Sequence, residues 1–335
     1  MEKRIINYTI STLLLVLMFA MAPTTSTAQA PKVAQAGMSW LNMPVGARAA
    51  GMGYASVAVS DDAGSFFWNP AGYAFTEGTN FFAHRTSWIA DINLSSAAVS
   101  HNMGKYGIYG VNMTSIDWGV FYGTRRADNE AGYIEMGEFS PSSSTIGLSY
   151  AYRITNEFGV GLNIKYLHER LGSTTVGSFE SPEMVKAQMN LFAIDFGTLY
   201  YIGWHDLRIG MSLKNFSNEE AYRAETFPLP MTFRLGLAMD ILNFTNINDD
   251  HELTVAADFV HSRDYSERVN VGAEYGFKEL FFLRGGYKFN YDIESVSMGG
   301  GLNLETNGIR LTVEYAYVQM DVFNNVNMFS LMFGF

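Results

Sequence analysis

Apolar residues occupy every second position along several stretches of this sequence. Between residues 309 and 317 they alternate with small, polar or charged residues such as Arg310 and Glu314, and residues 159–166 and 253–259 show the same pattern. A period of two is typical of a β-strand whose two faces meet different surroundings. A charge facing lipid at mid-bilayer would cost roughly 2–4 kcal/mol. Because the charges fall on one face only, the pattern predicts strands of a membrane β-barrel.

Composition supports an all-β transmembrane barrel over a soluble domain. Hydrophobic residues make up 48% of the chain and charged residues only 16%, whereas soluble domains are about 25% charged. After residue 28 no apolar run approaches the roughly 20 residues that a membrane-spanning helix needs. A closed barrel is the strand structure that leaves no backbone group unpaired in lipid. The absence of cysteine excludes a disulfide scaffold, a thiolate metal site and a lipid anchor on cysteine.

The first 28 residues have the organisation of a signal peptide. Lys3 and Arg4 precede an apolar stretch at residues 13–21, and the small residues 26–28 form a cleavage pattern that favours cutting after Ala28. A retained membrane helix is the alternative, but the apolar core is shorter than such a helix needs. We therefore expect export and insertion in the outer membrane.

Charge narrows the possible partners of the mature chain. Removing the signal peptide takes away Glu2, Lys3 and Arg4 and leaves Lys+Arg 20 and Asp+Glu 32, a net charge of −12. This balance argues against recognition of nucleic acid or anionic lipid by charge. We expect outer-membrane lipid around the barrel, protein partners, and no nucleic acid.

Counting alternating segments predicts about fourteen strands between residues 79 and 335, with twelve or sixteen as alternatives. If the first strand runs outward, the long connections at residues 117–143 and 169–188 lie on the outer side, as in other outer-membrane barrels. The expected strands are residues 79–89, 91–102, 105–116, 144–153, 158–168, 189–202, 206–216, 230–242, 252–260, 267–276, 280–289, 294–303, 309–318 and 325–335.

The segment between the signal peptide and the first strand, residues 29–78, is predicted to be a hatch inside the barrel. Its core at residues 39–75 does not alternate and is rich in Ala and Gly, which allow close backbone approach. A cation enclosed there must be paired, so we expect Arg48 to meet a wall carboxylate, with Asp195, Asp258, Glu274 and Glu314 as candidates. The residues singled out in the hatch are Arg48, Gly51, Gly53, Asp61, Asp62, Trp68, Asn69, Pro70 and Gly72.

These residues carry a resemblance to a known family. The runs 41–44, 46–53, 61–63 and 68–72 (LNMP, GARAAGMG, DDA and WNPAG) resemble the amino-terminal signature of the PorV/PorQ family, which is related to FadL-type fatty-acid channels. The resemblance implies a fourteen-stranded barrel with a hatch, and a role in type IX protein secretion. PorV-like members receive cargo with carboxy-terminal signal domains from the translocon, and PorQ-like members belong to the surface attachment complex.

Three functions follow as hypotheses. The first is a protein-binding barrel of the secretion system, whose outer loops carry aromatics, although these could instead form the interfacial aromatic girdle. The candidate partner-binding residues are Trp118, Phe121, Tyr122, Tyr133 and Phe139. The second is a FadL-like channel that admits a hydrophobic ligand to its lumen. In either case the terminal Phe335 resembles a barrel-assembly signal, or it simply packs.

An outer-membrane enzyme is the third hypothesis, and the sequence gives it little support. Six histidines are present, but none belongs to a recognisable nucleophile motif. His251-Glu252 begins like a zinc motif without its second histidine, and Asp61-Asp62 is typical of a turn or helix cap. We expect no catalytic residues, no metal and no cofactor.

Overall fold

The computed structural model describes residues 35–178, 181–221, 226–244 and 250–335. The predicted signal peptide, residues 1–28, lies outside these described residues. In the described part of the chain, no helix is both long enough and apolar enough to cross a membrane.

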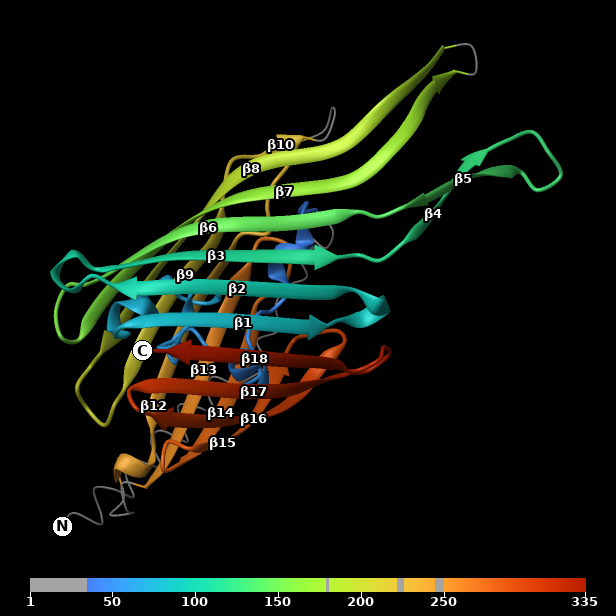
Figure 1. Ribbon diagram of the computed structural model, residues 1–335. Coiled ribbons are helices and arrows are strands. Elements are labelled where there is room, and N and C mark those ends of the chain that lie inside the picture. The colour runs from blue at the N-terminus through green and yellow to red at the C-terminus, as the bar shows by residue number, and fades with distance from the viewer. Residues whose placement is uncertain (1–34, 179–180, 222–225, 245–249) are drawn as a thin grey trace. The chain divides into compact units, whose positions relative to one another are not determined.

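Fourteen antiparallel strands form one closed barrel (Figure 1). The barrel closes where β1 pairs with β18, with Ala83 opposite Leu331. The predicted all-β barrel and the count of fourteen are confirmed. The wall strands are β1 Thr79–Ser87, β2 Asn93–Asn102, β3 Ile108–Asp117, β6 Ser142–Arg153, β7 Phe158–Ser178, β8 Ser181–Tyr201, β9 Arg208–Phe216, β12 Thr232–Asp240, β13 His251–Ser262, β14 Arg268–Phe277, β15 Phe281–Phe289, β16 Glu294–Thr306, β17 Ile309–Met320 and β18 Val326–Gly334.

Most strand ends lie within a few residues of the predicted ones, and the departures have local causes. β3 begins at Ile108 rather than at residue 105 because Gly104–Tyr106 form a 3₁₀ turn, η5, which Gly104 enters at φ 63°. β2 begins at Asn93 because another such turn, η4 (Ile89–Asp91), joins it to β1. These turns lie at opposite ends of the barrel.

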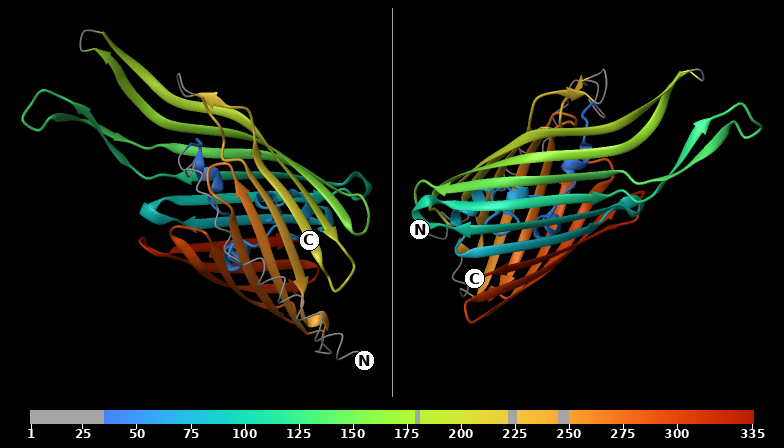
Figure 2. Two further views of the ribbon diagram at one scale, coloured as in Figure 1. Left: turned by 180° about the vertical axis from the view of Figure 1, so that it is seen from behind. Right: turned by 45° about the horizontal axis from the view of Figure 1, so that its top comes forward.

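The two long connections form β-ribbons, a conformation that we did not predict for them. β7 and β8 pair without interruption except for a bulge near Gly172, from Phe158 opposite Tyr200 to Ser178 opposite Ser181. Within the other connection, β4 (Phe121–Arg126) pairs with β5 (Tyr133–Phe139) as a separate two-stranded sheet. Residues 173–178 contain several β-branched residues, which favour strands. Both ribbons extend beyond the same end of the wall (Figure 2).

The predicted alternation between the two faces of the wall is confirmed. On β7, Leu162 and Ile164 are exposed, whereas Asn163 and Lys165 are buried. Apolar side chains therefore cover the outer surface, where a barrel meets lipid. The charged side chains that the wall buries on its inner face include Lys165, Asp195, Asp258, Glu274, Arg284, Lys288 and Glu314.

The amino-terminal segment, Met38–Phe75, packs against the inner face of this wall as short helices joined by turns. They are η1 Ser39–Asn42, α2 Ala47–Gly51, η2 Ser65–Phe67 and η3 Pro70–Phe75. Helix α2 contacts β15 to β18, and η3 contacts β6 to β8, on the other side of the barrel. Buried apolar residues of the segment and of the wall form shared clusters. The segment therefore contributes much of the core.

Candidate functional site

Wall glycines allow the backbone of the amino-terminal segment to approach the strands directly. A Cβ atom on Gly286 of β15 would lie 2.0 Å from the nitrogen of Gly53, and one on Gly161 of β7 would lie 2.2 Å from the carbonyl carbon of Pro70. Gly53 itself has φ 64°, and its nitrogen donates to Ser297 Oγ at 3.0 Å. Larger side chains at these positions would force the segment away from the wall.

Asn69 ties the segment to itself and to the wall. Its amide Nδ2 donates to the carbonyl oxygens of Val57 at 2.9 Å and Thr198 at 3.0 Å, while its Oδ1 accepts from Ala71 N and caps η3. Pro70 follows at the first position of that helix, where a missing N–H costs nothing. Asn69 is fully buried, so water cannot reach its amide group. These hydrogen bonds satisfy the donors and the acceptor of that group instead.

Two further glycines and Trp68 complete the packing of the predicted motif. A Cβ on Gly72 would lie 1.8 Å from Ser60 O within the segment, and one on Gly51 would lie 3.1 Å from Gly299 Cα of the wall. Trp68 donates from Nε1 to Val45 O at 2.6 Å. The motif residues are therefore brought together, and their functional role stays a prediction.

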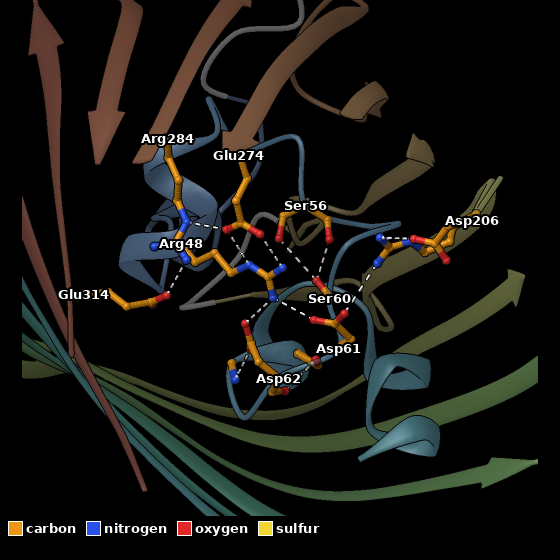
Figure 3. Close-up of polar contacts among 12 residues, drawn as sticks. Arg48, Ser56, Ser60, Asp61, Asp62, Asp206, Glu274, Arg284 and Glu314 are labelled. Carbon is orange, nitrogen blue, oxygen red and sulfur yellow. Dashed lines mark hydrogen bonds and ion pairs between the residues drawn. The ribbon is translucent and has the colours of Figure 1, made fainter. Parts of the chain in front are cut away.

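Arg48 lies at the centre of an ionic network between the segment and the wall (Figure 3). Its Nε and Nη2 donate to the two oxygens of Glu274 on β14, at 3.0 and 2.8 Å. Its Nη1 donates to Asp61 Oδ1 at 2.7 Å and to Asp62 Oδ2 at 3.0 Å. Burial acts to lower the pKa of Arg48, but the carboxylates of Glu274, Asp61 and Asp62 outweigh it and raise the pKa well above its usual value. Arg48 therefore keeps its positive charge.

Two wall arginines extend the network to neighbouring strands. Arg284 of β15 donates to Glu274 and pairs with Glu314 of β17 at 2.9 Å. Arg208 of β9 pairs with Asp206 at 2.6 Å and with Asp61 at 3.4 Å. The network thus joins strands on different sides of the barrel through the segment.

Of the four wall carboxylates proposed as partners of Arg48, only Glu274 pairs with it. Asp195 pairs with Lys165 at 2.8 Å, and Asp258 accepts from the backbone nitrogens of Ser56 and Val57. The roles of Asp61 and Asp62 as partners of Arg48 were not predicted. The signal was present, because the cation and both carboxylates lie within one non-alternating segment. Asp62 Oδ1 also accepts from Gly64 N at 2.6 Å, as expected of a turn.

Two cavities adjoin the segment. The larger, of about 690 Å³, opens at the end of the barrel that carries the short turns, and Arg48, Asp61, Asp62 and Glu274 line it. The smaller, of about 60 Å³, lies between the segment and the inner wall, with Trp68, Lys214 and Arg234 among its lining residues. The larger cavity is lined mainly by charged and polar residues, and the smaller by polar and apolar residues in similar numbers.

The β4–β5 ribbon presents large apolar side chains to solvent. Tyr122 is 77% exposed and Phe121 45%, and Tyr133 and Phe139 are also exposed. Met136 on β5, which we did not predict as a binding residue, is 55% exposed. Trp118 differs from the other four predicted residues, since it is half-buried and donates from Nε1 to Ser143 Oγ at 2.9 Å. It packs where the ribbon leaves the wall.

The described residues contain no group of three or more His, Asp or Glu side chains that could hold a metal ion. One serine and one histidine do meet: His84 Nδ1 lies 2.9 Å from Ser330 Oγ. The other ring nitrogen faces Thr86 Oγ1 at 2.7 Å, where a catalytic triad would have a carboxylate. Ser330 is fully buried and accepts from Ala47 N, so this pair holds the segment to the wall.

Phe335 pairs with the start of the first strand. Its nitrogen donates to Thr79 O at 3.0 Å, and its ring lies 6.1 Å from that of Phe81. Phe335 is 59% exposed. It is thus accessible at the end of the last strand, and its role in assembly stays a prediction.

The closed wall, the apolar outer surface and the charged interior define an outer-membrane β-barrel of the FadL-like kind. The toluene transporter TbuX of Ralstonia pickettii has this fold, with a TM-score of 0.57 and 15% identity over 87% of this chain and 98% of that one. TodX of Pseudomonas putida gives a TM-score of 0.54 and 11% identity over 86% and 96%. At such identities the likeness shows the fold alone.

The family follows from sequence. Residues 26–262 match the family model described as type IX secretion system protein PorV, and this chain belongs to that family. No curated protein matches it significantly. The predicted resemblance is confirmed, and with it the assignment to an outer-membrane barrel of the type IX secretion system.

Proposed function

We propose that this PorV-family barrel is a non-enzymatic, protein-binding component of type IX secretion. Its partners would be the translocon or cargo proteins with carboxy-terminal signal domains, bound through the ribbons at one end of the barrel. Outer-membrane barrels place short turns in the periplasm and longer connections outside, so the ribbons face the cell exterior. The observation that carries this proposal is the exposure of Phe121, Tyr122 and Met136 on the β4–β5 ribbon.

Two physical arguments support binding at this ribbon. An isolated two-stranded ribbon is marginally stable in water, and exposed aromatic and Met side chains are typical of binding surfaces. The alternative, that these residues belong to the interfacial girdle, suits residues on the wall better than Tyr122. Tyr122 belongs to β4, and the β4–β5 ribbon extends beyond the wall (Figure 1). A partner that covers the ribbon would bury these side chains.

A secretion assay tests this role. Tyr122→Ala with Met136→Ala should lower the release of cargo by at least about fivefold, because residues at the centre of an interface contribute more than 1 kcal/mol each. The matched control is Leu148→Ala with Leu283→Ala, which removes apolar side chains of similar exposure from the wall. Both variants must reach the outer membrane at the parent level. Normal release from the ribbon variant would contradict the proposal.

We further propose that the amino-terminal segment acts as a hatch, which closes the lumen of the barrel.

The alternative function is a channel for hydrophobic small molecules. Such a channel would require the amino-terminal segment to move. The observation that supports a channel is the lumen cavity of about 690 Å³. Eight carboxylates and three arginines line this cavity, however, whereas ligand pockets for apolar molecules are mostly apolar. This composition favours the protein-binding role.

A further inference from the structure

The small cavity beside Trp68 has a cationic lining. Three of its lining side chains are cations, Lys165, Lys214 and Arg234, and one is a carboxylate, Asp195. Asp195 is engaged with Lys165, whose Nζ lies 2.8 Å away. Asp195 also interacts electrostatically with Lys214 of β9, but among the described residues of the lining neither Lys214 nor Arg234 of β12 forms an ion pair with a carboxylate.

These two cations flank the same ring of the amino-terminal segment. Lys214 Nζ lies 5.9 Å and Arg234 Cζ lies 5.0 Å from the centroid of Trp68. Asp258 interacts electrostatically with Arg234 but accepts hydrogen bonds from the backbone of the segment. With Lys165, Lys214 and Arg234 counted as cations and Asp195 and Asp258 as anions, the formal charges around the cavity sum to +1. Lys214 and Arg234 are half-buried, and a bound anion would give both of them a charged partner.

The hydrogen bonds lead to the same conclusion. Arg234 Nη1 is buried and, within the described residues, has no hydrogen-bond partner. Lys214 Nζ donates to Phe67 O at 2.5 Å, and an ammonium group has three donors. Charge-assisted donors on two strands thus border one small cavity. Oxyanions accept several such bonds at once.

The size of the cavity limits the ligand. A volume of about 60 Å³ exceeds the 10–15 Å³ that one water molecule needs and is well below the roughly 300 Å³ at which pockets for larger ligands begin. A compact oxyanion of four or five heavy atoms suits it.

We propose that the cavity between Trp68, Lys214 and Arg234 is a binding site for a small oxyanion of the size of phosphate or sulfate. The bound anion would bridge β9 and β12 beside the amino-terminal segment. It would therefore hold the segment to the wall at a second place, apart from Arg48. This site is independent of the proposed ribbon interface.

A cysteine reporter tests the proposal, since the chain has no native cysteine. Ser65→Cys replaces a fully buried side chain of the segment, and its rate of maleimide labelling measures opening of the segment. Refolded protein is titrated with inorganic phosphate or sulfate, with chloride replacing it at constant ionic strength. A ligand that binds only the closed state slows opening as its concentration rises. We expect both oxyanions, but not chloride, to slow labelling.

Variants and a crystal separate this site from general salt effects. Lys214→Met or Arg234→Met should raise the half-saturating phosphate concentration by about tenfold or more, because each removes a charge-assisted donor. Arg310→Met, which removes a cation from the larger cavity, is the matched control. It should leave the half-saturating phosphate concentration unchanged. Crystals grown from wild-type protein refolded with selenate should show anomalous density beside Trp68, whether or not the variants fold. No selective slowing, an equal response in all variants, or no selenate in the cavity would each overturn the proposal.

Discussion

Replacing Arg48 by Ala should release the amino-terminal segment without unfolding the barrel. The wall strands pair with one another around the whole circumference, so their hydrogen bonds do not depend on Arg48. The segment does depend on it, because Arg48 joins Asp61 and Asp62 to Glu274. The variant therefore separates the stability of the segment from that of the wall.

The free-energy cost of Arg48→Ala follows from how exposed the carboxylate partners of Arg48 are. Removing one member of a buried ion pair costs about 3–5 kcal/mol, and Glu274 is only 8% exposed. Glu274 keeps Arg284 as a partner, which places its contribution near the lower limit. Asp61 and Asp62 are 34% and 25% exposed, and exposed pairs contribute about 0–1 kcal/mol each. We expect a total of about 3 kcal/mol.

Labelling of the Ser65→Cys reporter measures this loss. If labelling follows transient opening of the segment, about 3 kcal/mol corresponds to about a hundredfold faster reaction. Arg48→Lys keeps the charge but loses the two-pronged contact with Glu274, and it should give a smaller increase, about tenfold. Arg310→Ala, an exposed wall arginine, is the control and should label at the parent rate.

The barrel itself is followed by its heat-modifiable migration on gels. All variants should keep the migration of the folded parent. If the Arg48→Ala variant is folded and labels within about twofold of the parent, the ionic network does not hold the segment, and the reasoning fails.

Two further predictions use the same reporter. Asn69→Asp should accelerate labelling as much as Asn69→Ala, by about tenfold or more, because an aspartate cannot donate to Val57 O and Thr198 O; slow labelling of the Asp variant would show that these bonds are unimportant. Gly286→Val should displace the segment, since its Cβ would lie 2.0 Å from Gly53 N, whereas Gly285→Val meets nothing within 4 Å and should label at the parent rate. Equal labelling of the two glycine variants would contradict the proposed close fit.

The barrel was predictable because period-two patterns specify both the strands and their faces. Glu314 and Ala316 are buried between exposed or half-buried neighbours, as their alternation required. The ribbons were not predicted. Beyond the wall neither face of β7 and β8 contacts lipid, so the alternation of apolar and polar residues weakens there. Pairing there depends on the opposite strand, which a local pattern does not contain.

The interior of the site was only partly predictable. A buried cation had to find a carboxylate, and Glu274 was among the four candidates. Which one it meets depends on how the segment crosses the lumen, and wall glycines such as Gly161 and Gly286 determine that path. The cationic cavity could not be predicted either, because Lys214 and Arg234 lie on different strands and meet only around Trp68.

Affinity purification tests directly whether this barrel binds proteins of the secretion system through its ribbons. Tagged protein is isolated from gently solubilised outer membranes, alongside a variant in which a short linker replaces residues 120–139, and co-purifying proteins are identified by mass spectrometry. We expect the wild type to recover a large translocon barrel or secreted proteins that share a carboxy-terminal domain, and the variant to lose them. Recovery of the barrel alone, with fatty acid or another lipid in its extract, would contradict the protein-binding role and favour a channel.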